Sequence, residues 1–152
     1  MIKRILALRY VCKKYNLKYI PKLFGDVGWI CTVEGRLCVS LLQKNFYDVL
    51  YHEVGHLVAD RSLKYKVKYL RALAAGQRIS FNGGGVFVRL QEEATASKFS
   101  LRVAKKKDKD YLKRAWYTYT GTVAKVINAD ELDKYVTTVA KYNKYFEGNT
   151  KC

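Results

Sequence analysis

Residues 45–59, NFYDVLYHEVGHLVA, contain both histidines of the chain, His52 and His56, with Glu53 directly after the first. Apolar residues recur through this stretch at the spacing of one helical face, which predicts a helix over 45–60 with one buried side. Positions four residues apart lie one above the other on a helix, so both imidazoles can bind the same tetrahedral metal ion. The HExxH pattern therefore predicts a zinc site, with Glu53 beside the open coordination position.

The alternative is that this short pattern occurs by chance in a helix whose histidines only make ordinary hydrogen bonds. Two features of the chain argue for the metal site. The motif lies in an apolar periodic run that can shelter a metal from bulk water, and an acidic segment follows later in the chain. Gly55 costs about 1 kcal/mol relative to alanine inside a helix, which indicates that another segment approaches its backbone closely.

Length and composition indicate one domain. The chain has 152 residues, 49% of them hydrophobic, which is enough to fill a single core. It contains 1 proline and no linker rich in serine or glycine, so we expect residues 1–152 to form a single domain. Within it we expect a catalytic core over 1–105 and a helical C-terminal extension over 106–152.

The chain is strongly basic, with a formal net charge of +16 from 29 Lys and Arg against 13 Asp and Glu. Charge of this size raises affinity for nucleic acids, anionic lipids and acidic proteins. Two interpretations stay open, a surface that binds nucleic acid and a merely solvated face of a highly charged protein. No stretch reaches the roughly 20 apolar residues of a membrane span. We expect a cytoplasmic protein without a transmembrane segment.

Periodicity and turn signals predict an α+β fold. Helices are predicted over 3–15, 45–60, 63–75, 91–104, 110–126 and 130–146, and strands over 17–24, 29–33 and 36–42. The three strands precede the motif helix and are expected to form a small antiparallel sheet. Residues 76–90 contain an Asn-Gly-Gly-Gly turn signal, which predicts a hairpin or a mobile loop.

The four cysteines lack the paired spacing of a zinc knuckle, which argues against a second metal site. If Glu34 and Gly35 form a two-residue turn, Cys31 faces Cys38 across the hairpin with Cα atoms about 5.5 Å apart. A disulfide fits that geometry. Two free thiols are the alternative, and a reducing cytosol favours them.

The zinc site needs a third protein ligand, and the chain has no third histidine. The ligand is therefore expected to be Glu or Asp, or less commonly Tyr or Cys. Glu92 and Glu93, at the start of the helix predicted over 91–104, are the best candidates. Their alternative explanation is a pair of carboxylates that the helix dipole favours in a first turn.

HEVGH at 52–56, followed by EATAS at 93–97, resembles the two motifs of the gluzincin metallopeptidases. Among them the chain resembles the small soluble minigluzincins, the ImmA/IrrE-type peptidases and the catalytic modules of HtpX-like membrane proteases. The resemblance covers residues 45–101. It implies a minimal zincin-like domain, in which a small sheet packs on the motif helix and on the glutamate helix, with extra C-terminal helices.

The resemblance also implies roles for individual residues. His52, His56 and Glu93 bind Zn²⁺, and Glu92 is the alternative third ligand. Glu53 acts as general base and then as general acid while a zinc-activated water hydrolyses a bond in a protein or peptide substrate. The implied activity is that of a zinc metalloendopeptidase, which can be latent.

The chain departs from the family pattern at two places. Ser97 stands where the membrane enzymes carry the aspartate that orients a metal-bound imidazole, and such a loss costs roughly 10- to 100-fold in metal affinity or activity. No further histidine can stabilise an oxyanion, so Arg114, Tyr117 and Tyr119 are the candidates. A tyrosine-rich core helix is the alternative explanation of these residues.

Two expectations concern partners. The strand over 36–42 is the segment expected beside the cleft, where an unpaired edge would bind an extended substrate. The competing hypothesis is a catalytically silent zincin-fold protein that binds nucleic acid or acidic proteins through its basic surface.

Overall fold

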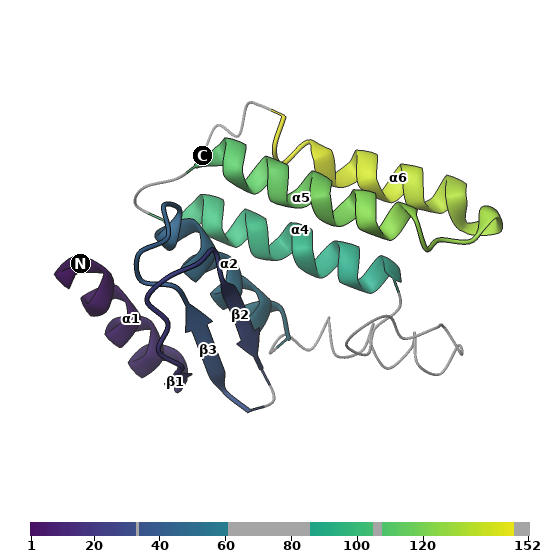
Figure 1. The fold of residues 1–152 in the computed structure, drawn as a ribbon. Coiled ribbons are helices and arrows are strands. Elements are labelled where there is room, and N and C mark those ends of the chain that lie inside the picture. The colour runs from purple at the N-terminus through teal and green to yellow at the C-terminus, as the bar shows by residue number, and fades with distance from the viewer. Residues whose placement is uncertain (33, 61–85, 105–107, 148–152) are drawn as a thin grey trace.

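The computed structural model describes residues 1–32, 34–60, 86–104 and 108–147, which form an α+β fold dominated by helices (Figure 1). In chain order the elements are α1 (Ile2–Tyr15), β1 (Lys18–Tyr19), β2 (Gly28–Cys31), β3 (Arg36–Val39), α2 (Phe46–Asp60), α4 (Val86–Val103), α5 (Lys109–Ala124), the 3₁₀ helix η1 (Ala129–Glu131) and α6 (Leu132–Asn143). The predicted helix over 63–75 lies outside the described residues. None of the described helices is long and apolar enough to cross a bilayer.

The sheet has three strands in the order β1-β3-β2 and is mixed. β2 pairs with β3 in antiparallel fashion, whereas β1 runs parallel to β3, so the prediction of an antiparallel sheet is wrong for β1. The chain reverses direction between β1 and β2 and again between β2 and β3, so the neighbouring strands β1 and β3 run the same way. Since β3 is the central strand, the expectation that residues 36–42 present a free edge is also wrong.

The β2–β3 hairpin has a different register from the predicted one. Trp29 pairs with Cys38 and Cys31 pairs with Arg36, because β2 ends at Cys31 and β3 begins at Arg36, farther apart in the chain than a two-residue turn allows. Cys31 therefore does not face Cys38. Both are free thiols, as is Cys12, which excludes the disulfide between Cys31 and Cys38.

The first core cluster lies where α1, the sheet and α2 meet. The side of α1 that carries Leu8 and Val11 packs against the sheet and α2, and the helix ends at Asn16 in the left-handed conformation. The buried members of the cluster are Leu8, Val11, Leu17, Leu37, Val39, Phe46, Val49, Leu50, Val54 and Leu57. The cluster buries one face of the motif helix, as its periodicity predicts.

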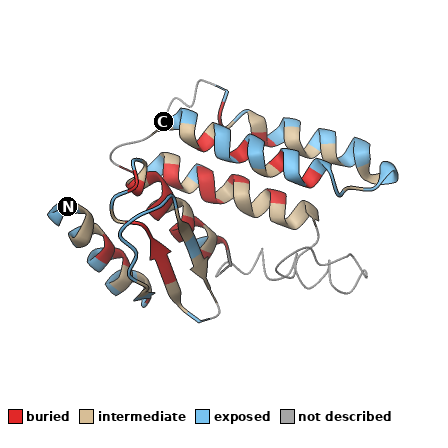
Figure 2. Cartoon of the chain, viewed as in Figure 1, coloured by how far each residue is buried: buried red, intermediate tan, exposed pale blue. Residues whose placement is uncertain are grey.

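A second core cluster joins α4 to α5 and α6, which lie side by side along it (Figure 2). Its centre is Trp116, which stacks on Phe146 with ring centroids 5.6 Å apart and donates a hydrogen bond of 2.8 Å to Asn143. α4 begins at Val86, so the prediction of a hairpin or loop is wrong for residues 86–90. Leu90 is fully buried in this cluster, and that burial extends the helix toward its N-terminus.

Candidate metal centre

α2 and α4 cross at Gly55 with their backbones in contact. A Cβ atom on Gly55 would lie 2.6 Å from Cα of Ala96 and 2.8 Å from its carbonyl oxygen. No side chain larger than hydrogen fits there without separating the helices. The close approach predicted from a glycine within a helix is confirmed, and it brings the motif histidines against the glutamates of α4.

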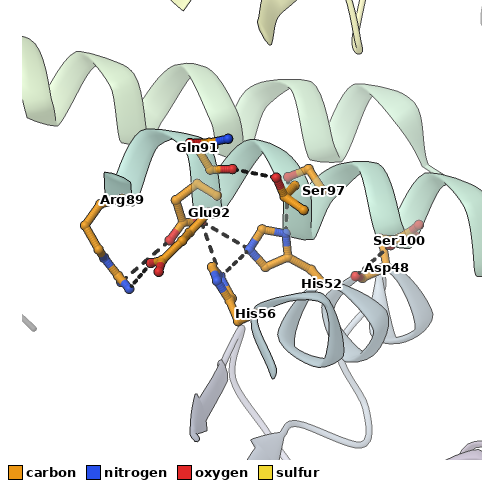
Figure 3. A network of polar contacts seen from close by, with 10 residues as sticks. Asp48, His52, His56, Arg89, Gln91, Glu92, Ser97 and Ser100 are labelled. Atoms are coloured by element: carbon orange, nitrogen blue, oxygen red, sulfur yellow. Dashed lines mark hydrogen bonds and ion pairs between the residues drawn. The ribbon is translucent and has the colours of Figure 1, made fainter. Parts of the chain in front are cut away.

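Figure 3 shows His52 and His56 of α2 pointing toward α4. There they meet Glu93, and the three ligand atoms lie within 4.8 Å of one another. The two Nε2 atoms are 3.1 Å apart. Oε2 of Glu93 lies 3.2 Å from Nε2 of His52 and 3.5 Å from Nε2 of His56. Ligand atoms about 2.0–2.1 Å from a tetrahedral centre are roughly 3.3 Å apart. The donor set and its spacing therefore fit a single metal ion held by three protein ligands.

The charge states around the cluster suit a cation. Burial alone would raise the pKa of Glu93, but its hydrogen bonds with His52 and His56 outweigh burial and hold that pKa well below the usual range. For His56, burial lowers the pKa, and the hydrogen bond and negative charge of Glu93 raise it above the usual value. Glu93 is thus an anion, and a metal ion would replace the protons that the imidazoles share with it.

Ser97 orients one of the imidazoles. Its hydroxyl oxygen lies 3.2 Å from Nδ1 of His52, the ring nitrogen that is remote from Glu93. Ser97 is buried, at 2% exposure. When Nδ1 donates its hydrogen to this hydroxyl, Nε2 keeps its lone pair for a metal. Ser97 thus lies at the position predicted for the residue that orients a metal-binding imidazole. In that tautomer its neutral hydroxyl accepts the hydrogen bond from Nδ1 that a carboxylate would accept more strongly.

Glu53 lies deep in the same site, beside β2. It is 9% exposed, and burial raises the pKa of its carboxyl group. A Cβ atom on Gly28 would lie 3.2 Å from Oε1 of Glu53 and 2.1 Å from Val49, so the bare glycine leaves the room that the carboxylate occupies. Gly28 was not among the predicted site residues. It directly precedes the strand predicted over 29–33, whereas a glycine that signals close backbone approach in a sheet lies inside a strand.

Arg89 is a second site residue that was not predicted from the sequence. Its guanidinium donates a hydrogen bond of 2.8 Å to Glu92, and Nη2 lies 3.9 Å from the outer oxygen of Glu93. Glu92 is therefore paired with Arg89 and lies outside the three-residue cluster. Spacings of three and four residues on a helix predict such pairs. The signal was lost because the helix was expected to begin only at residue 91.

The three oxyanion candidates have different places in the structure. Arg114 is exposed on α5. Tyr117 is 38% exposed and donates a hydrogen bond of 2.9 Å to Glu147. Tyr119 faces α4, where its hydroxyl interacts with Arg89 and with the charge of Glu93, and burial raises its pKa to about 12. Tyr119 is the candidate that the fold brings to the site, and it is a protonated hydroxyl.

Comparisons of the chain with protein-family models, curated proteins and solved structures give no match. The functional assignment therefore depends on the geometry of the site. Two imidazoles and one carboxylate converge from two packed helices, and a buried carboxyl group lies next to them.

Proposed function

We propose that the chain is a zinc-dependent metallopeptidase with a zincin-like fold. The observation that supports the proposal is the cluster of His52, His56 and Glu93, whose donor atoms are spaced as in a tetrahedral site. Structural zinc sites have four protein ligands, whereas catalytic sites have three and keep one position open. The described residues supply three, which is the catalytic number.

Each residue of the site has a role in the proposed hydrolysis. Bound zinc would lower the pKa of water and polarise the carbonyl of the scissile bond. Glu53 takes the proton of the attacking water and returns it to the leaving amine, a task that its raised pKa suits. Ser97 holds the ring of His52, and Arg89 holds the outer oxygen of Glu93. Tyr119 keeps its proton and can donate a hydrogen bond to developing negative charge.

The substrate that best fits this site is an extended peptide. β2 is an edge strand of the described sheet, and its residue Gly28 lies directly against Glu53. An extended chain that pairs with the free edge of β2 would pass the carboxylate, using backbone hydrogen bonds that need no particular side chain. In this proposal β2 lies beside the cleft, in place of the strand predicted over 36–42.

The alternative is a catalytically silent protein with the same fold that binds nucleic acid or acidic proteins. The net charge of +16 and the hydroxyl of Ser97 in place of a carboxylate favour it. Binding driven by phosphates weakens linearly in log affinity against log salt concentration. A duplex affinity with that slope, together with zinc binding and no cleavage, would select this alternative.

The test compares the wild type with Glu53→Gln, Glu93→Ala and Glu92→Ala after purification without an affinity tag. Metal content is measured by plasma mass spectrometry, and cleavage is measured on an unfolded protein. We expect one zinc per chain in the wild type, Glu53→Gln and Glu92→Ala, and none in Glu93→Ala. Cleavage should be lost in Glu53→Gln alone among the zinc-loaded proteins. Equal cleavage by Glu53→Gln and the wild type would refute the proposed mechanism.

A further inference from the structure

α1 has an apolar stripe on the side that faces away from the core. Ile2, Leu6 and Tyr10 follow one another at four-residue spacing and are 75%, 56% and 59% exposed. Leu8 and Val11, which are buried in the first core cluster, lie on the opposite side of the helix. Four-residue spacing keeps side chains on one face. The stripe is therefore a continuous exposed apolar surface, distinct from the face of α1 that packs into the first core cluster.

Cations surround this stripe. Lys13 continues it toward the C-terminal end of α1, Arg9 lies on one flank, and Lys3 and Lys14 lie on the other, by their positions on the helix. All four are exposed, and the chain has no acidic residue before Asp26. Nζ of Lys14 lies 5.6 Å from the ring centroid of Tyr10, so aromatic and cation belong to one surface.

We propose that α1 docks the protein on an anionic lipid surface, with Ile2, Leu6 and Tyr10 among the acyl chains and the cations at the head groups. Helices that lie in a membrane interface combine an apolar face with Lys and Arg beside it. A nucleic acid backbone would attract the cations but would gain little from exposed Ile2 and Leu6. A second copy of α1 would bring like charges together.

The rest of α1 holds this surface in place. Nη1 of Arg4 donates hydrogen bonds of 2.6 Å to the carbonyl of Leu41 and 2.9 Å to that of Gln43, and its guanidinium lies over the ring of Phe46. Docking therefore needs no rearrangement of the helix. Figure 1 shows α1 at the end of the molecule away from α5 and α6. The docking surface does not use the metal ligands, so this proposal is independent of the proposed peptidase activity.

The test is co-sedimentation of the full chain with vesicles of phosphatidylcholine and phosphatidylserine, compared with pure phosphatidylcholine, at physiological ionic strength. We expect binding to the anionic vesicles only. Leu6→Gln keeps the charge and should weaken binding about tenfold, since it removes a buried leucine side chain from the interface. Val136→Gln on α6 is the matched control, because Val136 is also 56% exposed, and it should bind like the wild type.

A second pair of variants tests the charges. Lys13→Gln should weaken binding roughly fivefold, the factor expected for one cation near an anionic surface. Lys125→Gln, at the exposed end of α5, should have a smaller effect. Helical circular dichroism and zinc content should equal those of the wild type, and Ile2→Gln replaces Leu6→Gln if that variant is not folded.

Three results would overturn the docking proposal. The first is that the wild type does not sediment with anionic vesicles. The second is that Leu6→Gln and Ile2→Gln bind vesicles as tightly as the wild type, because attraction would then be purely electrostatic. The third is that the protein binds duplex DNA or polyglutamate under the same conditions but no vesicle, which would identify a different partner of the basic surface.

Discussion

Gly55→Ala is the substitution whose effect the structure specifies most closely. The added methyl group would lie 2.6 Å from Cα of Ala96, whereas ordinary van der Waals contact begins at 3.4 Å. The three nearest atoms that it meets all belong to the backbone of Ala96, so rotation of a side chain cannot relieve the overlap. α2 and α4 must therefore move apart, by a distance on the order of 1 Å.

Two opposing terms set the change in stability. Overpacking a close contact costs about 1–3 kcal/mol, and replacing glycine by alanine within a helix returns about 1 kcal/mol. We expect a net loss of up to about 2 kcal/mol in the free energy of unfolding of the metal-free protein. Zinc affinity should fall further, since ligand distances must hold to about 0.2 Å and the ligands come from both helices.

The assay is urea unfolding in the presence of a chelator, followed by competition titration of zinc. Gly121→Ala is the control, because a Cβ atom there meets nothing within 4 Å and the residue is exposed on α5. It should raise the free energy of unfolding by about 0.5–1 kcal/mol and leave zinc affinity unchanged. A Gly55→Ala protein that is as stable as the wild type and binds zinc equally well would refute the helix contact.

Three further variants test individual contacts at the site. Ser97→Ala removes the hydroxyl that holds the imidazole of His52 and should lower zinc affinity about tenfold. The control, Ser100→Ala, loses a buried hydrogen bond to α2 and should lower stability but leave zinc affinity unchanged. Equal zinc affinities of the two variants would contradict the role of Ser97. Arg89→Met should weaken zinc binding several-fold and Arg89→Lys should weaken it less, whereas the control Arg102→Met, at the other end of α4, should leave it unchanged. Equal zinc affinities of all three variants would contradict the positioning role of Arg89. Burial raises the pKa of Glu53, so at any pH above the pKa that Glu53 has in the unfolded chain, its ionisation lowers the free energy of unfolding. Glu53→Gln should therefore raise the urea midpoint of the metal-free protein at neutral pH. An unchanged midpoint would contradict burial of a charged group.

Local pattern was sufficient for the motif helix. The apolar period predicted a helix over 45–60, and α2 spans Phe46–Asp60. The same period placed His52 and His56 on one face, because that relation depends only on helical geometry. Gly55 within the predicted helix indicated a close backbone contact, because the cost of glycine in a helix can be read from the local sequence. It did not indicate that Ala96 is the partner, because that depends on how the helices pack.

Sheet topology and register depended on interactions that local pattern does not encode. Short strands signal only that a segment is extended, so the parallel pairing of β1 with β3 and the pairing of Trp29 with Cys38 were both missed. Register follows from loop length and from which faces are buried together. The position of β3 between two partners, and hence the position of β2 beside Glu53 at an edge of the described sheet, exists only once the three strands assemble.

The sequence alone was enough to place two imidazoles on one helical face and to make Glu92 and Glu93 the best candidates for a third ligand. It left the choice between Glu92 and Glu93 open, because the two adjacent glutamates have the same charge and helix propensity and differ only by about 100° in direction. The crossing of α2 and α4 at Gly55 turns Glu93 toward the histidines, while Glu92 pairs with Arg89. The direction of a glutamate side chain on α4 selects a metal ligand only because α2 packs against one side of α4, and this packing is a property of the tertiary structure.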